Sequence, residues 1–458
     1  MRKVAITVWI GMTVRNVLYG ATLGSLCEEH EVTIVSNYEA SLRKTLKEHQ
    51  LSYKRLKVPR WQFPGIQSVL AQWLYDWNYF ALWQMKKPST AEIIIQWEKE
   101  NRRLRYCFNY LGGWLVQALR RRRSDTDILR DIAYFLGIKE QLRKFDAVLV
   151  SSTDLPKDQL IAYACLKNKV PLICIVHSWD NLPGRGLLAA VPDKLLVWNK
   201  SMVKDAVELL NVPKERVVVV GGPQYETYRR LSKLTSYDEF SQRLDIPSET
   251  KIITYTAGVE WVYPEEQLLI EKLILEINRG RFGKAILIIR LHPTDERTRI
   301  YRDHYGSTFL PVRLDEADAG FAAMNIGATG APDSVANFVE IMQFSDVVLN
   351  VASTTTLDAI LFDTPVVCPY FNFNIPDDAY NAVSKLYNTH HYKEVTESGA
   401  IYLPRSFVQL VSDVEEAILF PERRRNKRRE LAHKLTPALP TSELIVAEID
   451  RTIAQRTC

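Results

Sequence analysis

The chain has 458 residues, of which 47% are hydrophobic and 25% charged, and its formal net charge is +5. This length suffices for two ordinary domains with sizeable cores, and no apolar run reaches the roughly 18 residues of a membrane-spanning helix. The amino-terminal residues lack a signal-peptide pattern, so we expect a cytoplasmic globular protein. The six cysteines are scattered along the chain, and we therefore predict neither disulfide bonds nor a metal site.

Strands and helices alternate in the first part of the chain. Apolar runs predict strands at Val4–Trp9 and Val32–Val35, with a helix at Gly20–Glu29 between them. The intervening residues Gly11–Tyr19 are expected to form a loop, and they lack the full G-x-G-x-x-G spacing of a dinucleotide site. The alternation resumes at Ala147, and it indicates a parallel, doubly wound sheet.

An aromatic and basic segment interrupts this alternation at about residues 60–135. It holds six of the ten tryptophans on helical spacing, which predicts a helical insertion in the first domain. The aromatic side chains suit a hydrophobic core, but such helices also bind membrane surfaces or bulky lipid-linked acceptors. The four arginines Arg120–Arg123 form either a solvated helix face or a site that attracts anionic lipid head groups. No nucleic-acid-binding motif accompanies them, so we expect no nucleic-acid partner.

The second half of the chain repeats the layout of the first half. It follows Leu231–Thr250, a polar stretch that we expect to be a linker, and it contains predicted strands at Lys251–Thr256, Ala285–Leu291 and Val347–Val351. The sequence thus predicts an α/β protein with two Rossmann-like domains. Their predicted bounds are 1–235 and 250–420, followed by C-terminal helices at 421–458 that cross back to the first domain. In such proteins the default site is a cleft at the carboxyl edges of the sheets.

Three polar turns follow predicted strands of the second half. Because parallel strands end at the same edge of a sheet, we expect these turns to converge. Glycine permits close backbone approach, histidine can donate a hydrogen bond to phosphate, and a helix start supplies free N–H groups. Each turn alone is also consistent with an ordinary cap or surface loop. Together they predict a site for nucleotide phosphates made by Gly258, Arg290, His292, Pro293, Ser353, Thr354, Thr355 and Asp358.

These turns carry a resemblance to a known family. The Arg-x-His-Pro run at Arg290 and the Ser-Thr-x-x-x-Asp run at Ser353 resemble the donor-binding half of GT-B glycosyltransferases. The similarity is greatest to bacterial sialyl- and Kdo-type transferases and to CDP-glycerol glycerophosphotransferases. The run His177–Gly186 is similar to a turn of the CDP-glycerol enzymes and of related surface-polysaccharide transferases. The resemblance implies a GT-B fold with an interdomain cleft, a UDP-, CDP- or CMP-linked donor, and no cofactor.

The same resemblance aligns Asp180 with the catalytic histidine of those enzymes. An inverting transfer needs a base that takes the proton of the acceptor hydroxyl while the nucleotide leaves, and a carboxylate can do this. We therefore predict Asp180 as the catalytic base and His177 as the second candidate. Asp180 could also be a simple turn residue ahead of Pro183 and Gly184.

The sequence accordingly predicts a metal-independent, inverting glycosyltransferase of cell-envelope polysaccharide biosynthesis. Its partners would be a nucleotide-sugar donor and a surface-glycan or lipid-linked acceptor, with peripheral contact at the anionic inner face of the plasma membrane. Three alternatives stay open: a CDP-glycerol-type polyol-phosphate transferase, a non-hydrolysing nucleotide-sugar 2-epimerase, and a non-catalytic scaffold of an envelope assembly complex. The presence of Asp180 in place of the family's histidine is the feature that favours the scaffold.

Overall fold

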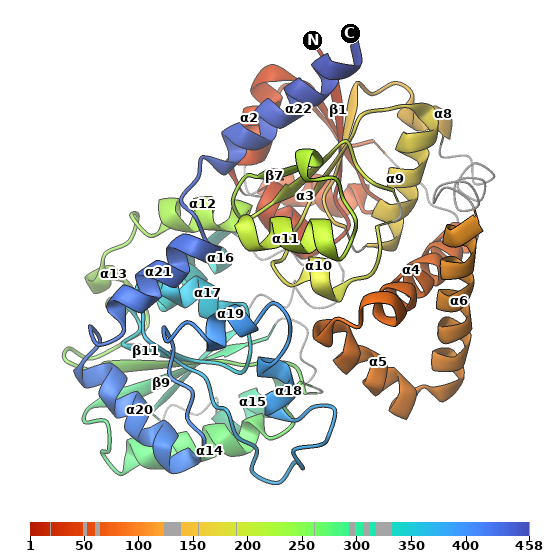
Figure 1. The fold of residues 1–458 in the computed structure, drawn as a ribbon. Coiled ribbons are helices and arrows are strands. Elements are labelled where there is room, and N and C mark those ends of the chain that lie inside the picture. Colours follow the sequence, from red (N-terminus) through yellow and green to blue (C-terminus); the bar gives the residue numbers. More distant parts are fainter. Residues whose placement is uncertain are drawn as a thin grey trace. The chain divides into compact units, whose positions relative to one another are not determined.

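The chain folds into two α/β units, each built on a parallel sheet (Figure 1). Unit 1 comprises Met1–Glu226 and Pro437–Cys458, and unit 2 comprises Thr227–Thr436. The computed structural model describes residues 1–18, 20–48, 53–59, 65–122, 139–153, 155–188, 190–260, 262–292, 298–305, 311–316 and 332–457. In this part of the chain, no helix is long and apolar enough to cross a bilayer.

Within the described residues, the sheet of unit 1 has seven strands in the order β3-β2-β1-β4-β5-β6-β7. Their bounds are β1 (Lys3–Thr7), β2 (Glu31–Val35), β3 (Leu56–Lys57), β4 (Ala147–Val150), β5 (Leu172–Ile175), β6 (Lys194–Val197) and β7 (Val217–Val219). The chain builds outward from β1 in one direction and from β4 in the other, so the strand order reverses between these two neighbours. Ligands of open α/β sheets bind at the carboxyl end of such a switch point.

Helices connect these strands. They are α2 (Ala21–Glu29), α3 (Glu39–Glu48), α8 (Lys139–Leu142), α9 (Pro156–Asn168), α10 (Asn181–Gly184), α11 (Lys200–Glu208) and α12 (Pro223–Leu231). The segment that we expected to be a loop after β1 is helical. One α-helical turn, α1 (Gly11–Thr13), continues into a π-helix at Val14–Leu18, whose apolar side chains are buried. The prediction was wrong because these residues supply buried side chains, which a surface loop does not.

The aromatic insertion is helical, as predicted, and belongs to unit 1. Its helices are α4 (Gly65–Lys86), α5 (Ser89–Asn101) and α6 (Arg103–Arg122). Tyr79, Phe80, Ala91 and Ile95 form a buried core with Trp83 and Tyr106 packed against it. The inward-facing aromatic side chains are therefore core residues.

A glycine pair lets α6 approach α4 closely. A Cβ atom at Gly113 would lie 2.8 Å from the Cβ of Phe80 and 2.9 Å from the backbone nitrogen of Ala81. A Cβ atom at Gly112 would meet the Trp77 ring at 2.2 Å. The spacing between these two helices therefore depends on the absence of side chains at both positions.

The last helix, α22 (Thr441–Thr457), packs against α2 of unit 1 (Figure 1). Its apolar face is buried through Ile445 and Ile449. At its start, Glu226 accepts hydrogen bonds from the backbone nitrogen and the hydroxyl of Ser442, at 3.1 and 2.5 Å. The carboxyl-terminal segment thus completes the unit that the amino terminus begins.

The described part of unit 2 forms a sheet of five strands in the order β10-β9-β8-β11-β12. They are β8 (Lys251–Thr256), β9 (Ala285–Leu291), β10 (Val312–Glu316), β11 (Val347–Leu349) and β12 (Val366–Val367). The helices are α13 (Tyr237–Arg243), α14 (Glu266–Asn278), α15 (Thr298–Tyr305), α16 (Pro332–Phe344), α17 (Thr355–Ile360), α18 (Val383–Tyr387), α19 (Lys393–Thr396), α20 (Phe407–Leu419) and α21 (Arg425–Leu435). The expected linker contains α13, which a reciprocal capping box between Ser236 and Glu239 begins.

We predict that Gly113→Ala destabilises the protein by about 1–3 kcal/mol, because the new methyl group forces α6 away from the α4 backbone. Gly24→Ala is the matched control, since Gly24 also lies inside a helix but its Cβ would only touch the Tyr53 ring at 3.7 Å. There the substitution should stabilise by up to about 1 kcal/mol through helix propensity. Urea unfolding followed by tryptophan fluorescence measures both. Equal changes in the free energy of unfolding for the two variants would contradict the close packing of α4 and α6.

Candidate functional site

The predicted donor residues of unit 2 lie at the carboxyl edge of its sheet. Because β9, β8 and β11 are neighbours, the turns that follow them are adjacent, as expected. The hydroxyl of Thr256, at the end of β8, lies 2.8 Å from that of Thr355, which begins α17. His292 follows β9 directly, and Pro293 lies outside the described residues. The structure thus brings two of the three turns into hydrogen-bond contact and sets the third beside them.

A buried asparagine shapes the turn between β11 and α17. The Oδ1 atom of Asn350 accepts hydrogen bonds from the Ser353 backbone at 3.2 Å and from the Thr356 hydroxyl at 3.0 Å. Ser353 in turn accepts from the Thr355 backbone at 3.3 Å. The side chain of Thr354, the N-cap residue, makes no capping bond. The turn is strained at Ala352, a non-glycine residue with φ of +44°.

Beneath this turn lies a hydrogen-bonded network that sequence reasoning missed. The Thr356 hydroxyl is 2.7 Å from the Tyr392 hydroxyl, and Cys368 lies 3.7 Å from both Asn350 and Tyr392. Burial raises the pKa of Cys368 to about 11 and the pKa of Tyr392 well above its ordinary value, so both stay protonated and neutral. Asp358, a predicted site residue, is also buried, one turn along α17. The available signal was the polar Asn350 at the end of an apolar strand.

The turn after β8 is held by a second buried group, Glu266. Its Oε1 atom accepts from the Gly258 backbone at 2.7 Å and from the Tyr255 hydroxyl at 3.1 Å, and its Oε2 atom accepts from the Tyr301 hydroxyl at 2.9 Å. The Gly258 amide therefore already has a protein acceptor. Close backbone approach by a ligand at Gly258 stays a prediction.

Arg290 makes contacts that the sequence did not indicate. Its guanidinium forms an ion pair with Asp315 of β10 and lies over the Phe338 ring, 5.3 Å from the ring centroid. Asn337 donates a second hydrogen bond to Asp315 at 2.7 Å. The charge of Arg290 is thus neutralised within the sheet edge, which weakens the expectation that it balances a phosphate.

A small cavity lies at the switch point of unit 1, at the carboxyl ends of β1, β4 and β5. Its volume of about 10 Å³ admits about one water molecule. The Thr7 hydroxyl accepts from the Ser151 backbone at 2.9 Å and joins the first two strand ends. The lining residues are Thr13, Asn16, Val17, Thr22, Leu149, Ser151, Ile175, Val176, His177, Pro223 and Ile445.

The two predicted catalytic residues share one turn after β5. His177 is buried and, unlike Asp180, is among the described residues that line the cavity. Asp180 is half-buried, accepts a hydrogen bond from the Ser178 hydroxyl, and precedes α10. The Ser178 backbone donates to the Asn181 side chain at 2.8 Å. Contact with the cavity therefore favours His177 as the catalytic residue, whereas the turn leaves the Asp180 side chain partly accessible to solvent.

The helical insertion packs against this turn. Gly186 has φ of +92°, and a Cβ atom there would lie 2.8 Å from the Tyr79 Cα atom of α4. The Leu187 backbone donates to Asn78 at 3.3 Å. A Cβ atom at Gly184 would meet the Thr90 side chain of α5 at 2.9 Å. Gly184 and Gly186 thus allow the turn to pack closely against the helices of the insertion.

Comparison with known proteins found matches among solved structures. No protein-family model matches the sequence, and no curated protein is detectably similar to it. Many solved structures match, and three of them that match over nearly the full length have TM-scores of 0.52–0.55. The first is a UDP-GlcNAc 2-epimerase from Neisseria meningitidis bound to UDP-GlcNAc, which is 14% identical, covers 98% of this chain and 99% of that chain, and has a TM-score of 0.54. The second is a UDP-N-acetylglucosamine 2-epimerase from Rickettsia bellii, which is 14% identical, covers 99% of this chain and 96% of that chain, and has a TM-score of 0.55. The third is a glycosyltransferase from Rickettsia africae, which is 11% identical, covers 99% of this chain and 98% of that chain, and has a TM-score of 0.52. Together with the two parallel sheets, these matches confirm the predicted GT-B-type α/β fold.

Proposed function

We propose that this chain is an enzyme of nucleotide-sugar chemistry. In the form we favour, it is an inverting glycosyltransferase whose transfer step uses no metal and whose acceptor is a surface glycan or a lipid-linked molecule. The observation that supports this most is the row of hydroxyl side chains at Ser353, Thr354 and Thr355, at the carboxyl edge of unit 2 where His292 also lies. Similar folds include the Neisseria epimerase bound to UDP-GlcNAc and the Rickettsia africae glycosyltransferase, which agrees with a nucleotide-linked donor.

In this proposal the phosphates of the donor bind the turns after β9 and β11. The hydroxyls of Ser353, Thr354 and Thr355 belong to half-exposed residues at the edge. Hydroxyl and backbone N–H donors that are fixed in advance stabilise the charge that develops on a departing nucleotide. The Asn350 network fixes them, since it sets the backbone of the turn.

We predict that His292→Ala and Ser353→Ala each weaken nucleotide binding roughly ten- to a hundredfold, because each removes a charge-assisted hydrogen bond to phosphate. Isothermal titration calorimetry with UDP, CDP, CMP and GDP measures the loss and identifies the nucleotide. His304→Ala, at an exposed histidine of α15, is the matched control and should leave affinity unchanged. Unchanged affinity in both site variants would place the nucleotide elsewhere.

The base is proposed to come from the turn after β5 in unit 1. Asp180→Asn keeps the shape of the side chain and removes its basicity, so it should lower kcat by roughly 10²–10⁴ and leave donor affinity unchanged. His177→Gln, made in parallel, tests the cavity residue in the same way. Turnover near the wild-type rate for Asp180→Asn, with a large loss for His177→Gln, would assign the role to His177. A product with retained anomeric configuration would exclude the base mechanism for both.

A second candidate is a nucleotide-sugar 2-epimerase, because two of the three similar structures named above are described as UDP-GlcNAc 2-epimerases. The decisive experiment incubates the nucleotide sugar with the protein without any acceptor and follows the sugar by NMR. An epimerase changes the configuration at C2 under these conditions, whereas a transferase needs its acceptor. Transfer from CDP-glycerol would identify the polyol-phosphate alternative, and absence of both nucleotide binding and turnover would identify the scaffold.

The outer face of the insertion is proposed to contact the membrane or a lipid-linked acceptor. Leu104 is 90% exposed, Leu111 66% and Trp114 63%, and Phe108 and Leu115 complete an apolar stripe along α6. Arg102 and Arg103, at the start of the helix, are exposed as well. Apolar and basic residues in this arrangement suit an anionic membrane surface. The side chains of Arg120–Arg123, which we expected to take part, lie outside the described residues.

Replacing Leu111 and Trp114 by serine should weaken binding to anionic liposomes by roughly tenfold or more, because each buried apolar side chain contributes on the order of 1.5–3 kcal/mol. Co-sedimentation at low and high salt measures the binding, which should fall as salt screens the arginines. Val408→Ser is the control, since Val408 is 80% exposed but lies on α20 of unit 2. Failure of the wild-type protein to co-sediment at low salt would leave the stripe without a membrane role.

A further inference from the structure

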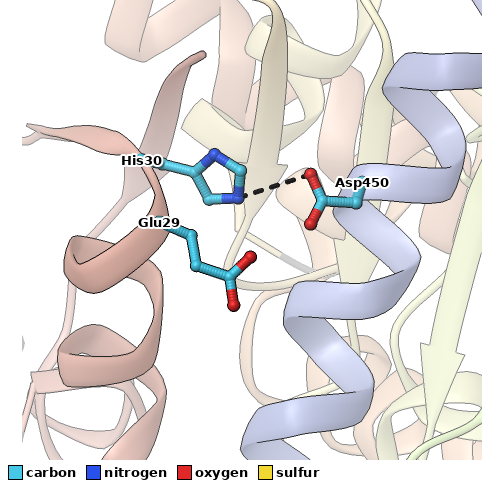
Figure 2. Close-up of side chains that lie close together, drawn as sticks. All are labelled: Glu29, His30 and Asp450. Carbon is cyan, nitrogen blue, oxygen red and sulfur yellow. Dashed lines mark ion pairs between the residues drawn. The ribbon is translucent and has the colours of Figure 1, made fainter. Parts of the chain in front are cut away.

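Three ionisable side chains converge at the amino edge of the unit 1 sheet. Glu29 ends α2, His30 follows it directly ahead of β2, and Asp450 projects from α22 (Figure 2). One ligand-capable atom from each lies within 4.8 Å of the other two. The backbone of His30 is fixed by a hydrogen bond from its nitrogen to the Leu26 carbonyl at 2.8 Å. The cluster therefore joins α2 to α22.

The imidazole of His30 lacks a hydrogen bond in this arrangement. The residue is only 3% exposed, and neither ring nitrogen has a hydrogen-bond partner in the described part of the chain. Its Nε2 atom faces the Asp450 carboxylate at 3.6 Å, which is longer than a hydrogen bond (Figure 2). Buried polar groups normally have a partner, so the geometry points to a ligand between the two side chains.

The distance matches two ligands of one metal ion. Zinc binds imidazole nitrogen and carboxylate oxygen at about 2.0–2.2 Å, so two such atoms in a tetrahedral site lie roughly 3.4 Å apart. We propose that Glu29, His30 and Asp450 bind one divalent transition-metal ion, with zinc as the preferred ion. Imidazole nitrogen selects zinc and its neighbours over magnesium and calcium, which prefer oxygen ligands alone. A tetrahedral ion would complete its shell with water.

Arg2 contacts the same carboxylate oxygen of Asp450 that faces His30. The Arg2 guanidinium lies 3.2 Å from Asp450 Oδ1 and 3.3 Å from the Asp450 carbonyl, and so it orients the carboxylate. With two carboxylates and one guanidinium, the cluster has one net negative charge before a metal binds. Arg2 would act as the outer group that fixes a metal ligand, as carboxylates commonly do for ligating histidines.

The site is separate from the proposed chemistry and does not rest on the proposed function. Arg2 and His30 lie next to the amino ends of β1 and β2, whereas His177 follows the carboxyl end of β5. The metal would attach α22 to α2 and stabilise unit 1. This inference differs from the prediction made from the sequence, in which the scattered cysteines indicated no metal site.

The test uses the full chain, freed of metal by dialysis against chelator, and titrates Zn²⁺ and Mg²⁺ by isothermal titration calorimetry. We expect one Zn²⁺ per chain, no Mg²⁺, and a rise in Tm of about 5 °C at a hundredfold excess over Kd. Glu29→Gln, His30→Gln and Asp450→Asn should each raise the Kd for zinc about tenfold or more. His433→Gln, at an exposed histidine of α21, should leave it unchanged.

Because Glu29 is exposed, its variant is expected to fold even if loss of a buried group unfolds the others. Zinc binding that is equally tight in Glu29→Gln and His30→Gln would overturn the proposal, as would the absence of a stoichiometric site in the wild-type protein. A Tm of the protein that depends on pH but not on zinc would also overturn the proposal. That result would indicate a direct ion pair between His30 and Asp450 in place of a metal site.

Discussion

The side-chain oxygen of Asn350 is the contact on which the candidate donor site depends. It accepts from the backbone of Ser353 and from Thr356, and so it closes the turn that carries the strand β11 into α17. Thr356 and Tyr392 extend the network into the core, where their burial excludes water as a competing partner. Asn350 is 0% exposed, and its hydrogen bonds hold the backbone N–H groups of the turn in fixed positions. A flexible loop would not fix these groups. The backbone that carries Ser353, Thr354 and Thr355 depends on this arrangement.

The fold was largely predictable from the sequence, for a physical reason. Strands of parallel sheets are covered on both faces, so they appear as short, continuous apolar runs, and β8 and β9 agree with the sequence-based bounds. The strand β10 was missed because Arg313 and Asp315 interrupt its apolar pattern, as is common for edge strands. The helical turns after β1 were missed because a glycine start and a polar middle resemble a loop. Propensity alone does not detect residues that become helical through burial.

The site was predictable only in outline. Turns that follow neighbouring parallel strands lie at the same edge of the sheet. A sequence that predicts the strands therefore also predicts which turns lie at that edge. It does not indicate which side chains are already bonded to the protein. The pairing of Arg290 with Asp315 and the capture of the Gly258 amide by Glu266 are contacts between residues 25 and 8 positions apart, and both depend on tertiary packing. Likewise, His30 and Asp450 are separated by nearly the whole chain, so no local pattern relates them.

The return of α22 to unit 1 has a consequence for biosynthesis. The polypeptide leaves unit 1 after Glu226 and comes back at Pro437, so unit 2 is a continuous insertion in the sequence of unit 1. Because domains fold as units while the ribosome extends the chain, unit 2 has all of its residues before unit 1 receives its last helix. The apolar surface that Ile445 and Ile449 cover then stays exposed to water until α22 has been synthesised. Synthesis of unit 1 therefore begins before that of unit 2 and is completed after it.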